Sequence, residues 1–248
     1  MKYGFVVPVY NHGDALECVV RNLVGYEIPI IVVDDGNDEY NKNAIEKVVK
    51  KYPLCVLVTR KKNGGKGKAL ADGVRKANEL GITHILQIDS DGQHDAGRVE
   101  HFIEVSKKNP DAIICGYPEY DETAPKHRVN GRAIANAWIH TVTLSNEIKD
   151  AMIGFRVYPV APYVKLLNRG AIIDARMGYD IEILVRLFWR NVPVISESVK
   201  VTYPIDGVSN FRMVRDNVRI SFTYARLFLG MIIRFPILVV RNLKNGNK

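Results

Sequence analysis

Two aspartates stand close together at the point where a buried strand should end. Asp89 and Asp91 follow the apolar run from Ile82 to Leu86, which is typical of a strand in a parallel sheet. Two carboxylates at this spacing repel each other unless a cation lies between them. Oxygen ligands of this kind suit Mg²⁺ or Mn²⁺. The residues therefore indicate a divalent-metal site, with an ordinary polar turn at Asp91-Gly92 as the alternative.

A second candidate is the segment Gly64-Gly65-Lys66-Gly67-Lys68, which is rich in glycine and basic residues. It lacks both the glycine spacing of a P-loop and the Ser or Thr that follows the P-loop lysine. It is no dinucleotide fingerprint either, because Leu70 stands at the position of the third glycine. Its backbone N–H groups and two cations could hold a diphosphate at the start of the next helix. A solvated basic turn is the alternative.

The elements that position these residues alternate between strand and helix. The first third of the chain predicts strands at residues 3–9, 28–33, 54–59 and 82–86, and helices at residues 15–24, 42–52 and 69–79. This alternation predicts an α/β fold with a mostly parallel sheet that is covered by helices on both faces. In such sheets, ligands bind at the carboxyl ends of the strands. One rim should therefore collect four polar segments, at residues 8–11, 34–36, 63–68 and 89–93.

The alternation continues less regularly in the rest of the chain. We expect helices at residues 99–107, 128–144 and 179–189, strands at 112–116, 154–158 and 192–201, and loops at 117–127 and 203–211. No internal repeat or low-complexity segment interrupts this pattern.

The composition favours a soluble globular protein, because 47% of its 248 residues are hydrophobic and 25% are charged. The 35 basic and 27 acidic residues give a formal net charge of +8, which favours an anionic partner such as a nucleotide or an acidic membrane surface. No basic patch interleaved with aromatic residues points to nucleic acid. Cys18, Cys55 and Cys115 lack metal-ligand spacing and indicate reduced thiols in the cytoplasm. The first apolar run is too short for a signal peptide.

Taken in order, the rim segments resemble the motifs of family 2 glycosyltransferases with the GT-A fold. They read Val7-Pro8-Val9-Tyr10-Asn11, Val33-Asp34-Asp35-Gly36, Gly65-Lys66-Gly67-Lys68-Ala69-Leu70 and Asp89-Ser90-Asp91-Gly92-Gln93-His94. Downstream, Gly154-Phe155-Arg156-Val157-Tyr158 is similar to a motif of the dolichol-phosphate mannosyltransferase-like branch. The resemblance covers residues 3–211. It implies a GT-A (nucleotide-diphospho-sugar transferase) fold and an inverting transfer of a sugar from a nucleoside diphosphate donor, with Mg²⁺ or Mn²⁺ bound.

The same resemblance implies which residues bind the donor. It places four of them at the base and ribose: Pro8, Tyr10, Asn11 and Asp35. Lys66 would lie near these or near the diphosphate, and the metal and diphosphate site would consist of Asp89, Asp91 and Gln93. A different resemblance, to the aspartate motif of haloacid-dehalogenase-type phosphatases, is disfavoured because that motif usually lies on the first strand.

The acceptor has two alternatives with different chemistry. A sugar or phenol hydroxyl must lose its proton to a carboxylate, and Asp180 or Glu182 is the candidate base. A lipid phosphate is already ionised and needs cations instead, for which Arg128, Arg132 and Arg156 are the candidates. We favour a polyprenyl phosphate or another lipid. A hydroxyl acceptor on a glycan or phenolic lipid, and a non-catalytic nucleotide-sugar-binding membrane scaffold, are the alternatives. The branch commonly has Gly-x-Ser-Lys after the last strand, whereas residues 207–210 read Gly-Val-Ser-Asn.

Residues 212–248 predict a C-terminal amphipathic helical segment that follows a glycosyltransferase domain at residues 1–211. At about 100° per residue, six arginines share one arc of the helix: Arg212, Arg215, Arg219, Arg226, Arg234 and Arg241. We expect this stripe to bind an anionic membrane surface, so that the protein is cytoplasmic and peripheral to the inner face of the membrane. Pro236 should kink or divide the helix. A transmembrane helix is disfavoured by the arginines, and packing on the protein's own core or in a homodimer is the alternative.

Overall fold

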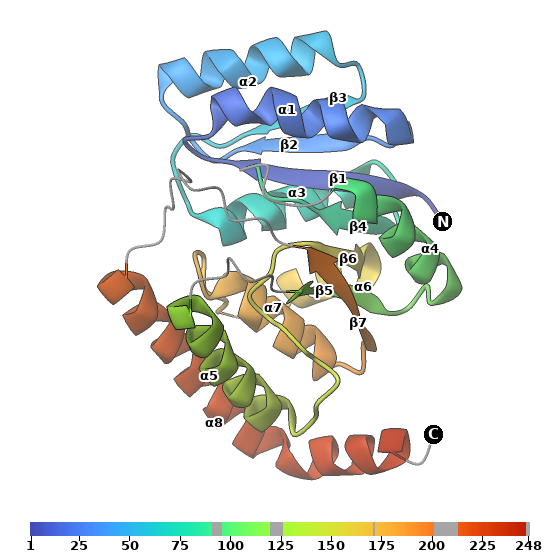
Figure 1. Ribbon diagram of the computed structural model, residues 1–248, viewed down its shortest axis with the longest axis vertical. Helices are drawn as coiled ribbons and strands as arrows, with labels where there is room; N and C mark the ends of the chain where they lie inside the picture. The colour runs from blue at the N-terminus through green and yellow to red at the C-terminus, as the bar shows by residue number, and fades with distance from the viewer. Residues whose placement is uncertain (91–95, 120–125, 171, 201–212, 247–248) are drawn as a thin grey trace.

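The computed structural model describes residues 1–90, 96–119, 126–170, 172–200 and 213–246, except the side chains of residues 96, 126–130, 213 and 244–246. A seven-stranded sheet runs through the described chain (Figure 1). Its strands are β1 (Tyr3–Val9), β2 (Ile30–Asp34), β3 (Cys55–Thr59), β4 (His84–Gln87), β5 (Ile113–Glu119), β6 (Arg156–Pro159) and β7 (Val194–Lys200). They lie in the order β3-β2-β1-β4-β6-β5-β7.

Helices connect most of these strands. They are α1 (Gly13–Leu23), α2 (Glu39–Lys51), α3 (Lys66–Glu79), α4 (Val99–Lys108), α5 (Lys126–Thr143), α6 (Val160–Leu167), α7 (Tyr179–Phe188) and α8 (Met213–Gly246), with short 3₁₀ turns η1 (Val24–Tyr26) and η2 (Ala96–Arg98). Helix α2 begins three residues earlier than the sequence pattern predicts, because the Asp38 side chain accepts a hydrogen bond from the Asn41 N–H and caps it.

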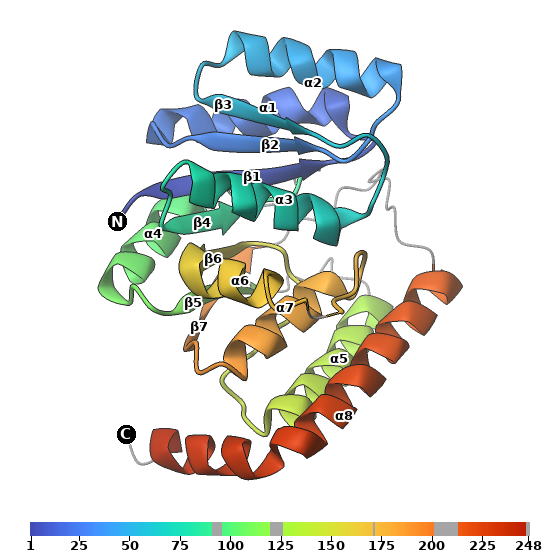
Figure 2. The same ribbon diagram turned by 180° about the vertical axis from the view of Figure 1, so that it is seen from behind.

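The sheet separates two hydrophobic clusters because side chains on a strand alternate between its faces. From β1, Phe5 and Val7 join the cluster under α1, α2 and α4, whereas Val6 joins the cluster under α3, α6 and α7. All three side chains are completely buried. A mostly parallel α/β sheet with helices on both faces is therefore confirmed (Figure 2).

One strand runs against the others, and the sequence pattern does not predict it. Strand β6 lies between β4 and β5 and is antiparallel to both. Its first residue, Arg156, therefore pairs with Gln87 at the carboxyl end of β4. This reversal brings the segment Gly154-Phe155 to the rim that carries Asp89.

The C-terminal helix α8 lies beside α5 in both views and changes direction near its C-terminal end (Figures 1 and 2). It is a single helix that continues through Pro236. Ile220, Leu227 and Leu238 are buried in the same cluster as residues of α5 and α7. The helix thus shares the core of the preceding residues, and its separation as a unit at residue 212 stays a prediction.

Three arginines of the α8 stripe contact the protein, which corrects the expectation that the whole stripe faces lipid headgroups. Arg226 binds Glu182 of α7 at 2.6 Å. Arg234 lies over the Trp189 ring at 4.8 Å, and Arg241 lies over the Phe188 ring at 3.4 Å. The arc of arginines is real, but attraction to a carboxylate and two aromatic faces outweighs exposure to water. Arg215 is exposed and Arg219 half-exposed, and Arg212 lies outside the described residues.

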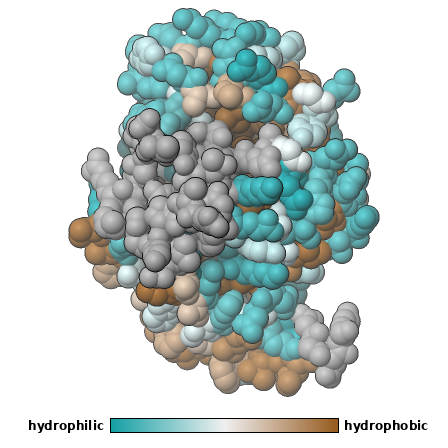
Figure 3. Space-filling view, in the orientation of Figure 1, coloured by the Kyte–Doolittle hydropathy of each residue, from teal (hydrophilic) through white to brown (hydrophobic). Residues whose placement is uncertain are grey.

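The outward side of α8 is apolar and exposed. Its large exposed side chains include Phe222, Leu229, Ile232, Ile233, Phe235, Ile237, Val240 and Leu243. Helix α5 adds Ile134 and Trp138, which are 64% and 42% exposed. Figure 3 shows hydrophobic surface at the bottom of the molecule, where α8 lies in Figure 1, and a largely hydrophilic surface over α1 and α2. We call this surface the α5–α8 apolar face.

By length and composition, α8 is also the one helix in the described chain that could cross a membrane. The window from Val214 to Leu243 has a mean hydropathy of 1.6, and 28% of it is buried against the protein. Because Arg226, Arg234 and Arg241 contact the protein, they interrupt the exposed surface of this helix less than the sequence indicates.

Candidate active site

The ends of β1 and β2 are tied together by a buried amide, Asn37. Its side chain donates to the Val9 carbonyl at 2.9 Å and to the Asp34 carboxylate at 2.6 Å. Its oxygen accepts the Asn11 N–H at 2.7 Å. Asn11 has a positive φ of 59°, a conformation that asparagine tolerates better than most residues. This network fixes the turn after β1 and leaves the neighbouring Tyr10 39% exposed at the rim.

Asp35 holds the glycine-lysine segment against the end of β2. Its carboxylate accepts the Gly64 and Gly65 N–H groups at 2.9 and 2.8 Å, and the Asn63 amide at 3.1 Å. The Arg60 Nε atom lies 2.9 Å from the same carboxylate, which is 2% exposed. Both oxygens of Asp35 are thus engaged by its own protein. Asp35 therefore holds the glycine-lysine segment in place. Its direct contact with a base or ribose stays a prediction, as it does for Pro8, Tyr10 and Asn11.

The same bonds leave few backbone N–H groups of this segment for a diphosphate. The N–H groups of Gly64 and Gly65 bind Asp35, and the Gly67 N–H donates to the Ala175 carbonyl at 2.9 Å. Gly65 has a φ of +91°, and a Cβ atom there would lie 2.4 Å from the same carbonyl, so only glycine fits. The segment is therefore a rigid support, and the group it presents to the rim is the Lys66 side chain.

The Lys66 ammonium lies between two carboxylates. Its Nζ atom is 2.7 Å from Asp89 Oδ1 and 2.8 Å from Asp180 Oδ2. The Lys66 and Asp89 side chains are 26% exposed and that of Asp180 is 9% exposed. Burial lowers the pKa of Lys66, but attraction by Asp180 and Asp89 outweighs burial and raises it above its ordinary value. The three residues come from α3, the end of β4 and the first turn of α7, and we call them the rim triad.

Gly154 makes the close approach of the rim triad possible. A Cβ atom at this position would lie 2.7 Å from Asp89 Oδ2 and 2.9 Å from Lys66 Nζ. Any larger residue would push into the ion pair, which explains why the segment before β6 begins with glycine.

Asp180 is oriented by two buried residues that the sequence pattern did not single out for this role. Gln87 of β4 donates from its side-chain amide to Asp180 Oδ1 at 2.9 Å. The Arg156 Nη1 atom donates to the Asp180 backbone carbonyl at 2.7 Å and to the Tyr158 hydroxyl at 2.9 Å. Burial raises the pKa of Tyr158 to about 12, so this hydroxyl stays protonated at neutral pH. The pairing of Gln87 with Arg156 across β4 and β6 places both beside Asp180.

Arg156 is therefore not an acceptor-binding cation, which corrects that expectation. Its side chain has no exposed surface, and the contacts above hold it in the core. A phosphate group outside the protein cannot reach it without unpacking the sheet. Its role is to position Asp180.

Glu182 is likewise not a candidate base, because it is completely buried and saturated. Its carboxylate accepts from Arg186 at 2.6 Å, from Arg226 at 2.6 Å and from the Asp174 N–H at 2.8 Å. Two guanidinium groups hold its charge, and a proton taken there would break a buried ion pair. The carboxylate instead fastens α8 to α7.

The remaining candidates pair with another residue or lie outside the described residues. Arg132 donates to Asp150 at 2.8 Å, and Asp150 is 1% exposed, so this guanidinium already has a carboxylate partner. The side chain of Arg128 and the residues Asp91 and Gln93 lie outside the described residues.

The rim supplies oxygen ligands of the kind that a divalent ion binds. Asp89 supplies carboxylate oxygens at a strand end, and Mg²⁺ and Mn²⁺ prefer such ligands. Among the described residues, no three His, Cys, Asp or Glu side chains form a metal-binding group. Asp91 is not among them, so a complete ligand set stays a prediction.

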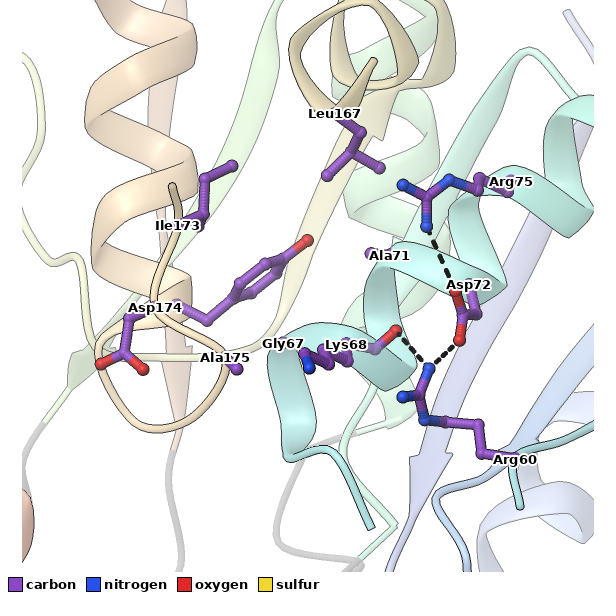
Figure 4. A pocket seen from close by; sticks show the side chains of 11 residues that line it. Arg60, Gly67, Lys68, Ala71, Asp72, Arg75, Leu167, Ile173, Asp174 and Ala175 are labelled. Carbon is purple, nitrogen blue, oxygen red and sulfur yellow. Dashed lines mark hydrogen bonds and ion pairs between the residues drawn. The ribbon is translucent and has the colours of Figure 1, made fainter. Parts of the chain in front are cut away.

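A cleft of about 280 Å³ lies between α3 and the segment that leads into α7 (Figure 4). Arg60 and Arg75 on its wall both pair with Asp72, and Figure 4 shows the three side chains pointing toward one another. Arg60 also binds Asp35. Because carboxylates engage both arginines, we assign the cleft no part in donor binding.

Comparison with solved structures identifies the fold as that of GT-A glycosyltransferases. The glucosyl-3-phosphoglycerate synthase of Mycobacterium tuberculosis, crystallised with Mn²⁺, UDP-glucose and phosphoglyceric acid, superposes with a TM-score of 0.70 over 93% of this chain and 79% of that chain, at 13% identity. The mannosyl-3-phosphoglycerate synthase of Rubrobacter xylanophilus gives 0.66 over 92% and 73%, at 12% identity. The predicted fold class is confirmed.

Residues 5–174 match glycosyl transferase family 2, and the chain belongs to this family of glycosyltransferases. A dolichyl-phosphate beta-glucosyltransferase of Dictyostelium discoideum is 26% identical over 88% of this chain and 73% of its own length. The uncharacterized protein MJ0544 of Methanocaldococcus jannaschii is 27% identical over 82% and 90%. A prophage bactoprenol glucosyl transferase homolog of Escherichia coli is 28% identical over 46% and 39%. The resemblance to the dolichol-phosphate sugar transferase-like branch is confirmed.

Proposed function

We propose that this protein is an inverting, divalent-metal-dependent glycosyltransferase that moves a sugar from a nucleoside diphosphate donor to a polyprenyl phosphate. The observation that carries the donor half is the rim triad, which places two carboxylates and a cation at the carboxyl ends of the parallel strands. Support for the acceptor half comes from relatives named for dolichyl phosphate and bactoprenol. The same names favour glucose as the sugar.

Each rim residue has a distinct task in this proposal. Asp89 and Asp91 would hold Mg²⁺ or Mn²⁺, with Gln93 beside them. The bound ion would supply Lewis-acid stabilisation of the departing diphosphate. Lys66 would add a positive charge at the same oxygens. Gln87 and Arg156 keep Asp180 at the edge of the sugar site through the contacts described above.

The acceptor phosphate would need no proton removed, so its binding depends on cations rather than on a base. Of the three arginines that the sequence indicates for this task, Arg156 is excluded by burial. Arg128 and Arg132 lie on α5, next to α8. An α5 helix that belongs in part to the α5–α8 apolar face would bring a lipid-borne phosphate to the same side of the protein.

The α5–α8 apolar face would lie in the membrane interface, with the protein on the cytoplasmic side. Because Arg226, Arg234 and Arg241 are engaged by the protein, the attraction to lipid would come mainly from apolar side chains and from Trp138 rather than from anionic headgroups. The alternative to membrane binding is a homodimer in which a second copy of the chain covers this face.

A hydroxyl acceptor is the second candidate, and Asp180 favours it. Its carboxylate lies at the rim, and a carboxylate is what a hydroxyl acceptor requires as base. A relative named poly(ribitol-phosphate) beta-glucosyltransferase, from Bacillus spizizenii, is 27% identical over 90% of this chain and 34% of its own length.

A donor and acceptor matrix tests both proposals. Purified protein would be incubated with UDP-glucose, UDP-GlcNAc or GDP-mannose and either a short polyprenyl phosphate or a simple sugar, with Mg²⁺, Mn²⁺ or EDTA. We expect a glucosylated polyprenyl phosphate with inverted anomeric configuration, formed only with metal. Transfer to the sugar alone, or equal rates in EDTA, would overturn the lipid-phosphate or the metal assignment, respectively.

A further inference from the structure

We propose that Lys66 is an exchangeable cation. Its ammonium pairs with Asp89 and Asp180, and when a divalent ion binds it would exchange these carboxylates for the phosphate oxygens of the donor. A divalent ion and a nucleoside diphosphate would then bind cooperatively. This inference rests on the proposed donor site and goes beyond it, because it assigns Lys66 a movement and predicts a thermodynamic coupling.

The charges and the exposure of the rim triad favour a divalent ion beside Asp89. It holds two carboxylates and one ammonium, so its formal charge is −1. Asp89 keeps 26% of its side chain exposed, so a divalent ion from solution can reach it. A divalent ion placed beside Asp89 would repel the Lys66 ammonium, since like charges this close are strongly unfavourable even near a protein surface.

The Lys66 side chain can change partners while its backbone stays in place. The turn before it is fixed by Asp35, and the N–H groups of Gly64 and Gly65 already have partners. The four-carbon stem of lysine is flexible, and its ammonium binds as a point charge in many directions. The residue is also the first of α3, and a helix N-terminus favours a nearby anion.

Each ligand alone therefore meets an obstacle that the other removes. A divalent ion alone must separate the ammonium from two carboxylates at 2.7 and 2.8 Å. A diphosphate alone must approach those carboxylates and suffers repulsion. When both bind, the ammonium exchanges carboxylate partners for phosphate oxygens, and the carboxylates gain the metal. Such coupling is reciprocal, so each ligand should tighten the other by the same factor.

The experiment measures Mn²⁺ binding to the full-length protein by calorimetry and by the electron paramagnetic resonance signal of free Mn²⁺, with and without UDP, and with GDP as a second nucleoside diphosphate. The variants are Lys66→Met, which removes the ammonium, and Lys66→Arg, which keeps a cation. Lys68→Met is the matched control, because it removes a lysine from the same segment that has no described contact with Asp89 or Asp180. Thermal unfolding confirms that each variant is folded.

We expect Lys66→Met to bind Mn²⁺ alone at least about tenfold more tightly than the unmodified protein, while Lys66→Arg and Lys68→Met stay within about threefold. UDP should tighten Mn²⁺ binding in both proteins, because the ion attracts the diphosphate directly, and by a larger factor in the unmodified protein, where the ammonium also exchanges partners. Equal Mn²⁺ affinities in Lys66→Met and Lys68→Met, or an undiminished effect of UDP in Lys66→Met, would overturn the exchange. Because Mn²⁺ binding requires no sugar transfer, tighter binding by Lys66→Met in a protein that transfers no sugar would uphold the exchange and refute the proposed function.

Discussion

Two charge clusters are centred on Asp180 and Glu182 of α7 and differ in net charge and in exposure to solvent. The rim triad has a formal charge of −1 and stays partly open to solvent. The second cluster joins Glu182 to Arg186 and Arg226, has a formal charge of +1, and its carboxylate has no exposed surface. The first can still accept a cation, whereas the second has no position left to fill. An unbalanced and accessible cluster indicates chemistry, and a saturated and buried one indicates structure.

The strongest test of this contrast removes Glu182. Glu182→Ala leaves Arg186 and Arg226 without their buried carboxylate, which should lower the free energy of unfolding by about 3–5 kcal/mol. Urea unfolding followed by circular dichroism measures it. Asp180→Asn is the comparison and should cost less, because the amide keeps the packing and Lys66 keeps Asp89 as partner. Equal losses for the two variants would contradict the division into a structural and a functional cluster.

At the rim, we expect a substitution to reduce turnover and to leave stability almost unchanged. Asp91→Ala should reduce turnover by at least about 10²-fold, because the metal ligand that we propose here would contribute several kcal/mol to stabilising the leaving diphosphate. Its unfolding free energy should stay near that of the unmodified protein. Initial rates at saturating donor and Mn²⁺ measure the first quantity and urea unfolding the second. A variant that keeps full turnover would remove the metal from the mechanism.

These clusters also show where the sequence stops being informative. The strand ends of the rim, the sheet class and the helices were predictable, because alternation and apolar runs report burial directly. The difference between Asp180 and Glu182 was partly predictable as well, since residues two apart on a helix do not face the same side. Their partners were not, because Gln87 and Arg226 reach α7 from elements 93 and 44 residues away. The antiparallel direction of β6 was not predictable for the same reason, because periodicity does not show which strands are neighbours.

The same limit explains the error at α8. Helical periodicity placed its arginines correctly on one arc, but it could not show that Glu182, Trp189 and Phe188 would occupy that side. For β6 and for α8 alike, the residue pattern of one element does not show which other elements pack against it. The arginines stabilise the fold and the apolar residues are left outside.

The α5–α8 apolar face therefore gives a distinct prediction for membranes. If apolar contact drives binding, flotation with liposomes should depend little on the fraction of anionic lipid or on salt, in contrast to a basic helix. Ile233→Asp should reduce partitioning by about tenfold or more, because Ile233 is 79% exposed on that face. Ser221→Asp, on the same helix and also exposed, is the control and should change it little. Binding that disappears at high salt would restore the electrostatic interpretation. A concentration-dependent dimer without liposome binding would assign the face to a second copy.

The smallest expected effect concerns the pH dependence of the rim triad. The pKa of Lys66 is raised in the folded protein, where burial opposes the shift and Asp180 and Asp89 outweigh it. A raised lysine pKa means that its stabilising effect is complete below the unfolded value of about 10.4 and is lost as pH rises through the folded value. The difference in unfolding free energy between the unmodified protein and Lys66→Met should therefore be constant from about pH 8 to pH 9.5 and should fall above about pH 10.4. Urea midpoints of the two proteins across this range measure it, and taking the difference cancels the tyrosines and cysteines that titrate in both. A difference that stays constant or grows beyond pH 10.4 would mean that Lys66 gains nothing from the two carboxylates, and the contrast between an ion-paired rim and a saturated α7–α8 cluster would then rest on Glu182 alone.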